Sequence, residues 1–379
     1  MQNPFTLQLV KDKNFCDRQK EIEDLLLFAK NGQNLVLFSP RRTGKSSLIL
    51  QVLKELKKEG YLTVYIDLFP VSSEKEFVSK LATNITREIG SGANVKTFKQ
   101  RFAELFLKII PTFEVKPDGV SFSVQFDSDA KFDILLEDLM GGIYKFLKRK
   151  NIKSCIAFDE FQEITELTES KTIEGTLRSY IQSNKEIAFF FVGSRRRILK
   201  DMFTNKKRPF YKSAFLYNLQ RIPEEDFVSY IIQKFSETGK ECSKDAANKI
   251  YNISQGYPYY VQKLASITWD LTEKKCNIEK VQKAYKILLK DETFDYENIL
   301  SGLTLVQKSL LKAIALDPTS SLFKINYLKK YSISIGGAQK GLKTLLLKDI
   351  IEKDEEGTYR VVDPVFRLWL LEYENLFEI

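Results

Sequence analysis

The residues Ser39-Pro40-Arg41-Arg42-Thr43-Gly44-Lys45-Ser46-Ser47 join a short apolar run, 34–38, to a stretch with helical periodicity, 48–58. The apolar run is typical of a buried strand, and the later stretch has the spacing of an amphipathic helix. Residues 39–46 match the pattern G-x-x-x-x-G-K-[ST], with Ser39 in the place of the first glycine. The strand before the loop and the helix after it are the context that this pattern requires. The order predicts a loop that wraps phosphate groups at the N-terminus of a helix.

The positions of this loop have expected roles in binding a nucleotide. Gly44 lets the backbone approach the phosphates, Lys45 neutralises the β- and γ-phosphates, and the Ser46 hydroxyl ligates Mg²⁺. ATP and Mg²⁺ are therefore the predicted cofactors. The nucleotide-binding residues expected here are Pro40, Arg41, Arg42, Thr43, Gly44, Lys45, Ser46 and Ser47. A chance Gly-Lys-Ser at a helix start is the alternative, and the flanking strand and helix argue against it.

Two acidic residues, Asp159 and Glu160, follow a second apolar run, 154–158. We expect Asp159 to hold Mg²⁺ through water and Glu160 to orient and polarise the attacking water. Alone, a strand that ends in two acids is more often a turn or a helix cap. Together with the phosphate loop, the pair favours catalysis of ATP hydrolysis.

A third apolar run, 187–192, ends in Gly193 and Ser194. Ser194 lies where such ATPases place a residue that hydrogen-bonds the γ-phosphate or the water, and an ordinary loop serine is the alternative. A basic run, 195–212, follows at once. One of its cationic residues, with Arg196 as the candidate, could act as an arginine finger that stabilises charge in the transition state. The same run is also suited to nucleic-acid phosphates, or to a solvated face.

Composition narrows the chemistry further. The 379 residues include no histidine, which excludes His-based acid–base catalysis, Ser–His and Cys–His dyads and His-containing zinc sites. The net charge of +9 fits a nucleotide, a nucleic acid or a membrane surface as partner, or solubility alone. No signal region and no apolar run near ~18 residues is visible, so we expect no membrane span and a cytoplasmic location. The scattered cysteines are typical of reduced thiols: Cys16, Cys155, Cys242 and Cys276.

Alternating strands and helices through residue 222 predict a parallel sheet wrapped by helices. The strands are expected at 34–38, 61–67, 154–158 and 187–192, and the helices at 17–30 with Asp17 as cap, 48–58, about 74–110, 132–149 and 170–183. Alternation around Pro117-Asp118-Gly119 predicts a hairpin insertion at about 111–126.

The C-terminal half has a different pattern. Residues from about 223 to 295 show only helical periodicity, and three helices followed by a hairpin of 349–353 and 358–362 predict a winged helix. The fold expected is therefore α/β, with a P-loop NTPase core at 1–222, a helical lid at 223–298 and a winged-helix domain at 299–379. ATP is expected between core and lid.

Four motifs together resemble the archaeal-type ATPases of the AAA+/STAND group of P-loop proteins, over nearly the whole chain. The motifs are Ser39-Pro-Arg-Arg-Thr-Gly-Lys-Ser46, Phe158-Asp-Glu-Phe-Gln162, Phe191-Val-Gly-Ser194 and Gly256-Tyr-Pro258. The resemblance implies that Arg18 helps line the adenine pocket, with Asp17 in the place of the usual glycine. It also implies that Pro258 and Tyr259 contact the base. The helix after Gly256 offers Lys263, and no arginine, at the family's usual sensor place, and 363–369 resembles the family's closing helix.

The expected winged helix leaves two function classes open. Its candidate recognition helix, 334–348, carries Lys340, Lys343 and Lys348, but the acidic tip 354–356 would repel phosphates. We favour a Mg²⁺-dependent ATPase that acts as a nucleotide-driven switch or oligomeric motor component, with an unknown protein partner or self-association. The alternative is a DNA-associated ATPase that grips DNA with the winged helix and 195–212. A metabolic kinase ranks third, because no acceptor site can be named.

Overall fold

The structure is a computed structural model that describes residues 2–8, 15–90, 105–116, 119–126, 130–183 and 185–372. The chain forms two compact units. The sheet unit comprises Arg18–Ser39 and Lys45–Leu219, and the helical unit comprises Met1–Asp17, Pro40–Gly44 and Gln220–Ile379. The phosphate loop is therefore divided, since Pro40–Gly44 belongs to the helical unit and its two flanks belong to the sheet unit.

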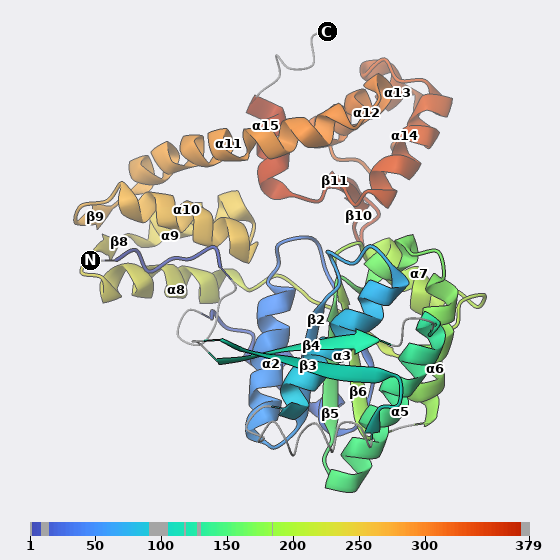
Figure 1. The fold of residues 1–379 in the computed structure, drawn as a ribbon. Helices are drawn as coiled ribbons and strands as arrows, with labels where there is room; N and C mark the ends of the chain where they lie inside the picture. Colours follow the sequence, from blue (N-terminus) through green and yellow to red (C-terminus); the bar gives the residue numbers. More distant parts are fainter. Residues whose placement is uncertain are drawn as a thin grey trace. The chain divides into compact units, whose positions relative to one another are not determined.

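The sheet unit contains a five-stranded parallel sheet in the order β2-β5-β6-β1-β7 (Figure 1). Its strands are β1 Leu35–Phe38, β2 Leu62–Asp67, β5 Ser154–Asp159, β6 Ile187–Gly193 and β7 Phe215–Asn218. Strands β1, β5 and β6 are buried along their whole length, because helices cover both faces of the sheet. The expected parallel α/β core is confirmed. Strand β7 was not expected, and three of its four residues are exposed.

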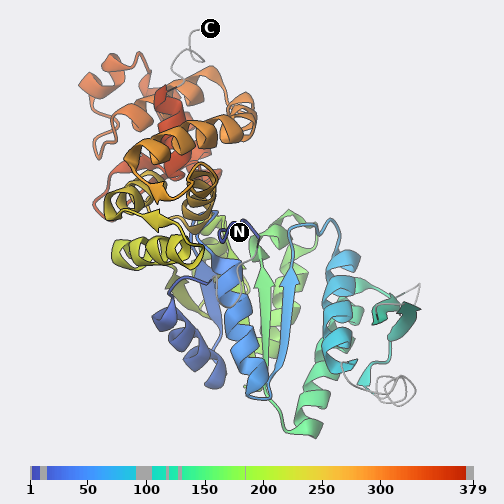
Figure 2. The ribbon, with the colours of Figure 1, turned by 90° about the vertical axis from the view of Figure 1, so that its left-hand side faces the viewer.

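Helices α1 Gln19–Lys30 and α2 Lys45–Lys58 lie on one side of this sheet, and α3 Glu74–Gly90 and α5 Phe132–Lys150 lie on the other (Figure 2). The unit also contains η2 Phe161–Glu166, α6 Ser170–Ser183 and α7 Arg196–Thr204. The expected cap of α1 is wrong: Arg18 holds the N-cap position, and Asp17 precedes it with φ +51°. The reason is a turn through two left-handed residues before the helix starts.

The hairpin insertion is confirmed by an antiparallel pair, β3 Ile109–Lys116 and β4 Gly119–Phe126. Pro117 and Asp118 of its turn lie outside the described residues. The helix expected at 74–110 ends too late, because residues 109 and 110 belong to β3. Its portion 91–104 also lies outside the described residues.

The helical unit continues with α8 Glu224–Glu237, α9 Lys244–Ser254, α10 Pro258–Asp270 and α11 Ile278–Ser301. Two short strands, β8 Glu241–Cys242 and β9 Lys275–Cys276, pair in parallel, so the expectation of helices alone needs correction. Two residues per strand are too few to give a readable alternation. In the part of the chain that the structure describes, no helix is long and apolar enough to cross a membrane.

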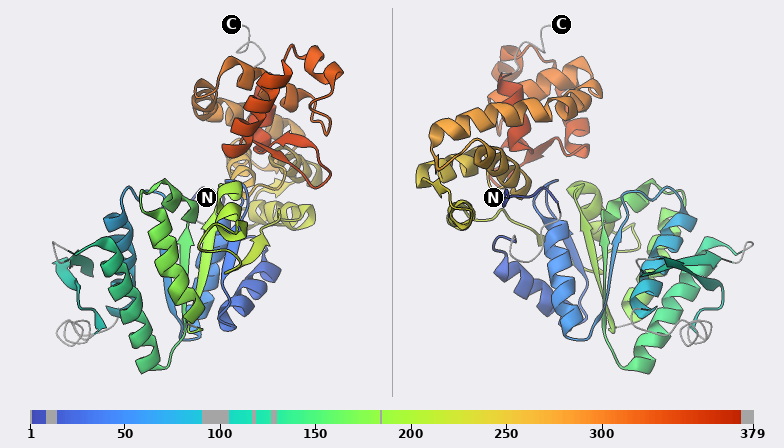
Figure 3. Two further views of the ribbon diagram at one scale, coloured as in Figure 1. Left: turned by 90° about the vertical axis from the view of Figure 1, so that its right-hand side faces the viewer. Right: turned by 60° about the vertical axis from the view of Figure 1, so that its left-hand side comes forward.

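Three helices and a hairpin complete the helical unit, as the winged-helix pattern predicts. They are α12 Leu305–Leu316, α13 Ile325–Lys330, α14 Ile335–Leu347, β10 Ile351–Lys353 and β11 Tyr359–Val361, followed by α15 Pro364–Glu372. Helix α12 begins with a capping box between Thr304 and Gln307. The long helix α11 packs against α15 and shares one hydrophobic core with α12 and α15 (Figure 3). The boundary expected at 298/299 between lid and winged helix falls inside α11.

Candidate nucleotide site

The phosphate loop connects β1 directly to the first turn of α2. Ser39 is fully buried and is not among the described residues with a positive φ, so a serine fits where the motif has its first glycine. Gly44 has φ +85°, a conformation that favours glycine. Helix α2 starts at Lys45, so its N-terminus, which carries a partial positive charge, lies at the end of the loop. The local chemistry of an anion site is present.

Lys45 and Ser46 lie at this helix start. The Lys45 ammonium group is buried and donates to the Ser39 carbonyl oxygen over 3.1 Å. The Ser46 hydroxyl donates to Oδ2 of Asp159 over 2.5 Å. Asp159 ends β5, and β6 separates β5 from β1 in the sheet, so the contact spans three strands. The structure thus brings the two expected metal-binding residues together.

The carboxylate of Asp159 is buried and has two further donors. The Tyr65 hydroxyl donates to Oδ2 over 2.6 Å, and the Glu160 amide donates to Oδ1 over 3.0 Å. Burial, and then the charge of Asp159, raise the pKa of Tyr65, so its hydroxyl stays protonated. Tyr65 comes from β2, next to β5, and no sequence motif pointed to it.

The oxygen atoms of Ser46 and Asp159 fit Mg²⁺, which binds one or two protein oxygens and takes its other ligands from phosphates and water. Among the described residues, no group of three or more carboxylates or thiols that could hold a metal ion occurs. Bound there, the ion would supply positive charge to the β- and γ-phosphates.

Glu160 lies directly after β5 and has φ +49°, so the chain turns sharply there. Its Oε2 accepts hydrogen bonds from the Ser194 hydroxyl at 2.8 Å, the Ser194 amide at 3.2 Å and Nε2 of Gln162 at 2.5 Å. Burial alone would raise the pKa of Glu160, but these hydrogen bonds and the charge of Lys45 outweigh it and lower the pKa. Glu160 is therefore a carboxylate at neutral pH, and its described hydrogen bonds all converge on Oε2.

Gln162 is fully buried and was noticed in the sequence only as part of a family motif. Its amide group also donates to Oε1 of Glu163 over 3.1 Å. A Cβ atom on Gly193 would lie 2.0 Å from Oε1 of Gln162, so position 193 must be glycine while Gln162 holds this place. Gly193 ends β6 next to Ser194, and Gln162 and Ser194 both donate to the Glu160 carboxylate.

The basic run 195–212 does not form one uniform surface. Arg195 binds Glu163 over 2.6 Å and Glu166 over 2.9 Å, and Arg208 forms an ion pair with the buried Glu174. Lys200 lies over the ring of Phe38, at 4.2 Å from the ring centre. Arg196, the candidate finger, is the first residue of α7 and is half-buried.

The remaining candidate nucleotide-binding residues differ in their exposure and in their contacts. Arg18 is buried with φ +75°, and its guanidinium binds Glu21 over 2.6 Å. The Thr43 hydroxyl donates to the Pro40 carbonyl over 3.1 Å. Arg41 is exposed, and Ser47 is half-buried in α2. Pro258, the first residue of α10, is near Gly44, with its ring 3.7 Å from where a Cβ atom would be.

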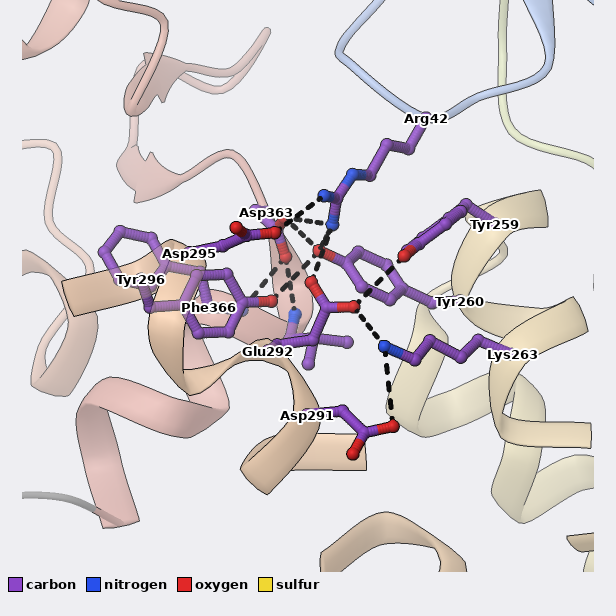
Figure 4. Close-up of polar contacts among 11 residues, drawn as sticks. Arg42, Tyr259, Tyr260, Lys263, Asp291, Glu292, Asp295, Tyr296, Asp363 and Phe366 are labelled. Atoms are coloured by element: carbon purple, nitrogen blue, oxygen red, sulfur yellow. Dashed lines mark hydrogen bonds and ion pairs between the residues drawn. The ribbon is translucent and has the colours of Figure 1, made fainter. Parts of the chain in front are cut away.

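Arg42 extends into a cluster of charged and aromatic side chains within the helical unit (Figure 4). Its Nη1 donates to Oε2 of Glu292 over 3.0 Å and to the Tyr260 hydroxyl over 2.6 Å. Its guanidinium also lies 4.4 Å from the centre of the Tyr259 ring. Burial would lower the pKa of Arg42, but Tyr260, Glu292 and Asp363 raise it, so the charge persists. The role expected for Arg42 was phosphate binding, and this network was not foreseen.

Lys263 of α10 belongs to the same cluster. Its ammonium group binds Oε1 of Glu292 over 2.8 Å, and the Tyr259 hydroxyl donates to the same oxygen over 3.2 Å. Burial would raise the pKa of Glu292, yet Lys263 and Arg42 lower it. The side chain at the family's usual sensor place is thus paired with α11.

Comparison with known proteins places this geometry in a family. The model of the ATPase domain found predominantly in Archaea matches residues 15–264. The chain belongs to this family. A model described as a probable winged helix domain matches residues 294–372. No curated protein sequence matches the chain.

Solved structures share the fold of this archaeal-type ATPase across both units. A Walker-type ATPase of Pyrococcus abyssi is 18% identical, with a TM-score of 0.70 over 95% of this chain and 97% of its own. The Orc2 protein of Aeropyrum pernix, solved with ADPNP and ADP, is 15% identical, with a TM-score of 0.57 over 97% and 96%. The Orc1 protein of Aeropyrum pernix, solved with DNA, is 11% identical, with a TM-score of 0.52 over 99% of each chain. At these identities the likeness shows the fold.

Proposed function

We propose that the chain binds ATP–Mg²⁺ at residues 39–47 and hydrolyses it to ADP and phosphate. One observation carries the proposal: Lys45, Ser46, Asp159, Glu160 and Ser194 all lie at the carboxyl edge of three adjacent strands, β5, β6 and β1. Ligands of open parallel sheets bind at this edge, and the N-terminus of α2 lies there to receive phosphates. Membership of the ATPase family supports the same reaction.

In this proposal Lys45 and the loop amides neutralise and orient the phosphates, and Ser46 with Asp159 would hold Mg²⁺. The Glu160 carboxylate then accepts a proton from the attacking water. Because its described hydrogen bonds all reach Oε2, we assign the proton to Oε1. Ser194 keeps the carboxylate in place, and Arg196 is the candidate that stabilises the charge developing on the phosphate.

We further propose a nucleotide-driven switch or motor component with the partition expected from the sequence: core 1–222, helical lid 223–298 and winged helix 299–379. In this proposal Arg18, Pro258 and Tyr259 would contact the base of ATP, and the lid would respond to the nucleotide state. The output would be a protein contact, including self-association, in the cytoplasm.

A second candidate function is a DNA-associated ATPase. Lys340 and Lys343 are exposed on α14, the helix that would enter a groove, and a similar fold was solved with DNA. Against it, the wing turn contains Asp354, Glu355 and Glu356, and Arg195 and Arg208 are bound by carboxylates. DNA binding that weakens steeply with added salt would favour this second function.

The test is steady-state ATP hydrolysis by the wild type, Glu160→Gln and Lys45→Ala, each with and without duplex DNA. We expect the wild type to turn over, Glu160→Gln to bind ATP–Mg²⁺ without hydrolysis, and Lys45→Ala to lose binding. Stimulation by DNA selects the second function. A wild type that binds no ATP–Mg²⁺ overturns the proposal, and binding without turnover leaves a nucleotide switch in place of an ATPase.

A further inference from the structure

Arg42 has a positive φ, a backbone conformation that residues with a side chain rarely adopt. Between Pro40 and Ser47, Arg42 and Gly44 have positive φ values, +136° and +85°, and only Gly44 is a glycine. An L residue with a side chain stays in such a conformation only where the surrounding structure holds it. The loop therefore depends on contacts outside itself.

The contacts that hold Arg42 come from α10 and α11. The amide of Tyr259 donates to the Arg42 carbonyl oxygen over 3.3 Å, which fixes the backbone. On the side chain, Glu292 and the Tyr260 hydroxyl accept hydrogen bonds while the Tyr259 ring lies against the guanidinium (Figure 4). The side chain of Glu292 is only 2% exposed, so it depends on the cations beside it.

The same network extends to Asp363, the residue directly before α15. The Tyr260 hydroxyl bonds to Oδ2 of Asp363, and Arg42 lies 4.0 Å from that oxygen. The other oxygen, Oδ1, accepts from the amides of Val365 and Phe366, both over 2.9 Å, and so caps α15. One hydrogen-bonded network therefore joins the phosphate loop, α10, α11 and the cap of α15.

We propose that Arg42 is a positioning residue whose ion pair with Glu292 sets the phosphate loop in its binding conformation and links nucleotide affinity to the cap of α15. This inference rests on the proposed function. Glu292 lies on α11, outside the loop, and reaches the phosphate site through Arg42. Because coupling between binding sites is reciprocal, a partner that displaces α15 changes the affinity for ATP.

The experiment compares wild type, Glu292→Gln, Arg42→Gln and the double variant in the full chain. The dissociation constant of a fluorescent N-methylanthraniloyl-ATP with Mg²⁺ is measured beside the melting temperature. We expect each single variant to bind about 5- to 100-fold more weakly. The double variant should bind no more weakly than the weaker single, because the two side chains act as a pair. In hydrolysis the loss should fall on KM, with kcat within a few-fold of wild type.

Glu279→Gln is the matched control, because it removes a carboxylate from the same helix where the partner is the exposed Lys283. It should leave the dissociation constant unchanged. Should Glu292→Gln fail to fold, Tyr260→Phe tests the same network by removing one hydroxyl. Variants that melt lower but bind with the wild-type constant would overturn the inference, as would losses that add in the double variant. A wild type that binds no nucleotide would instead overturn the proposed function.

Discussion

The two ends of the phosphate loop lie in different charged clusters. At Ser46 the hydrogen-bond partner is Asp159, the last residue of β5, and Glu160 follows it within the sheet unit. At Arg42 the partners come from α10, α11 and the start of α15 in the helical unit.

The clusters differ in how fully their carboxylate oxygens are hydrogen-bonded. Both oxygens of Glu292 are hydrogen-bonded to protein, whereas the described hydrogen bonds of Glu160 all reach one oxygen. A carboxylate oxygen with no described hydrogen bond can accept a proton from water. A carboxylate with both oxygens hydrogen-bonded to protein is suited to holding its partners in place. The first cluster is therefore the one we assign to reaction and the second the one we assign to positioning.

The largest effect that would test this contrast is on turnover. Glu160→Gln should lower kcat by about 10²–10⁴, the usual contribution of a general base, while ATP binding is retained. Single-turnover hydrolysis and equilibrium binding measure the two effects separately. Glu166→Gln, which removes an exposed carboxylate bound to Arg195, is the control and should keep its rate. Equal losses in both variants would remove Glu160 from the chemistry.

Gly193→Ala should disturb the first cluster by displacing Gln162. The added Cβ atom would meet Oε1 of Gln162 at 2.0 Å, and overpacking of this kind costs about 1–3 kcal/mol. A lower melting temperature and slower hydrolysis are both expected. Gly175→Ala is the control, because nothing lies within 4 Å of its added Cβ atom. If both variants melt alike, the close contact of Gly193 with Gln162 does not matter for stability.

Tyr65→Phe should have a smaller effect, of about 0.5–1.5 kcal/mol, on Mg²⁺ affinity. The variant removes a hydrogen bond to Oδ2 of Asp159 and leaves the Ser46 contact in place. The Mg²⁺ concentration at half-maximal hydrolysis should rise several-fold with little change in kcat. An unchanged Mg²⁺ dependence would mean that Tyr65 does not orient Asp159 for the metal.

The pH dependence of hydrolysis offers the smallest effect. The pKa of Glu160 is lowered, because hydrogen bonds and Lys45 outweigh burial, so its carboxylate persists through the neutral range. The rate should fall only as pH drops below the ordinary glutamate range, near ~4.3. Gln162→Leu removes a donor to the charged form, which raises this pKa and moves the acid limb to higher pH. A pH–rate profile at saturating ATP checks the direction, and a shift to lower pH would contradict the assignment.

Much of the sheet unit follows from local sequence. The strands around 34–38, 61–67, 154–158 and 187–192 were predicted because each is a compact apolar run beside a helical pattern. Strand β7 was missed because Phe215-Leu216-Tyr217-Asn218 is short and pairs only with β1, at the edge of the sheet. The cap of α1 was missed because two left-handed residues, Asp17 and Arg18, have no side-chain signal of their own.

The candidate site divides in the same way. Lys45, Ser46, Asp159, Glu160 and Ser194 were chosen from the sequence because strand ends and helix starts are local features, and parallel strands bring their carboxyl ends to one edge. Tyr65 was not chosen, since a tyrosine within an apolar strand has no pattern that reveals its hydrogen-bond partner. The depth of Gln162 beside Gly193 likewise became visible only from packing.

By itself the sequence determined the phosphate loop, the acidic strand end and the winged-helix pattern, because each is a contiguous stretch whose backbone needs specific residues. Only the tertiary structure decided that Arg42 binds Glu292, 250 residues away, and that Asp363 joins the same network. The physical reason is that a long cationic side chain pairs with whichever buried carboxylate the packing of distant helices brings within reach, and spacing along the chain does not encode that choice.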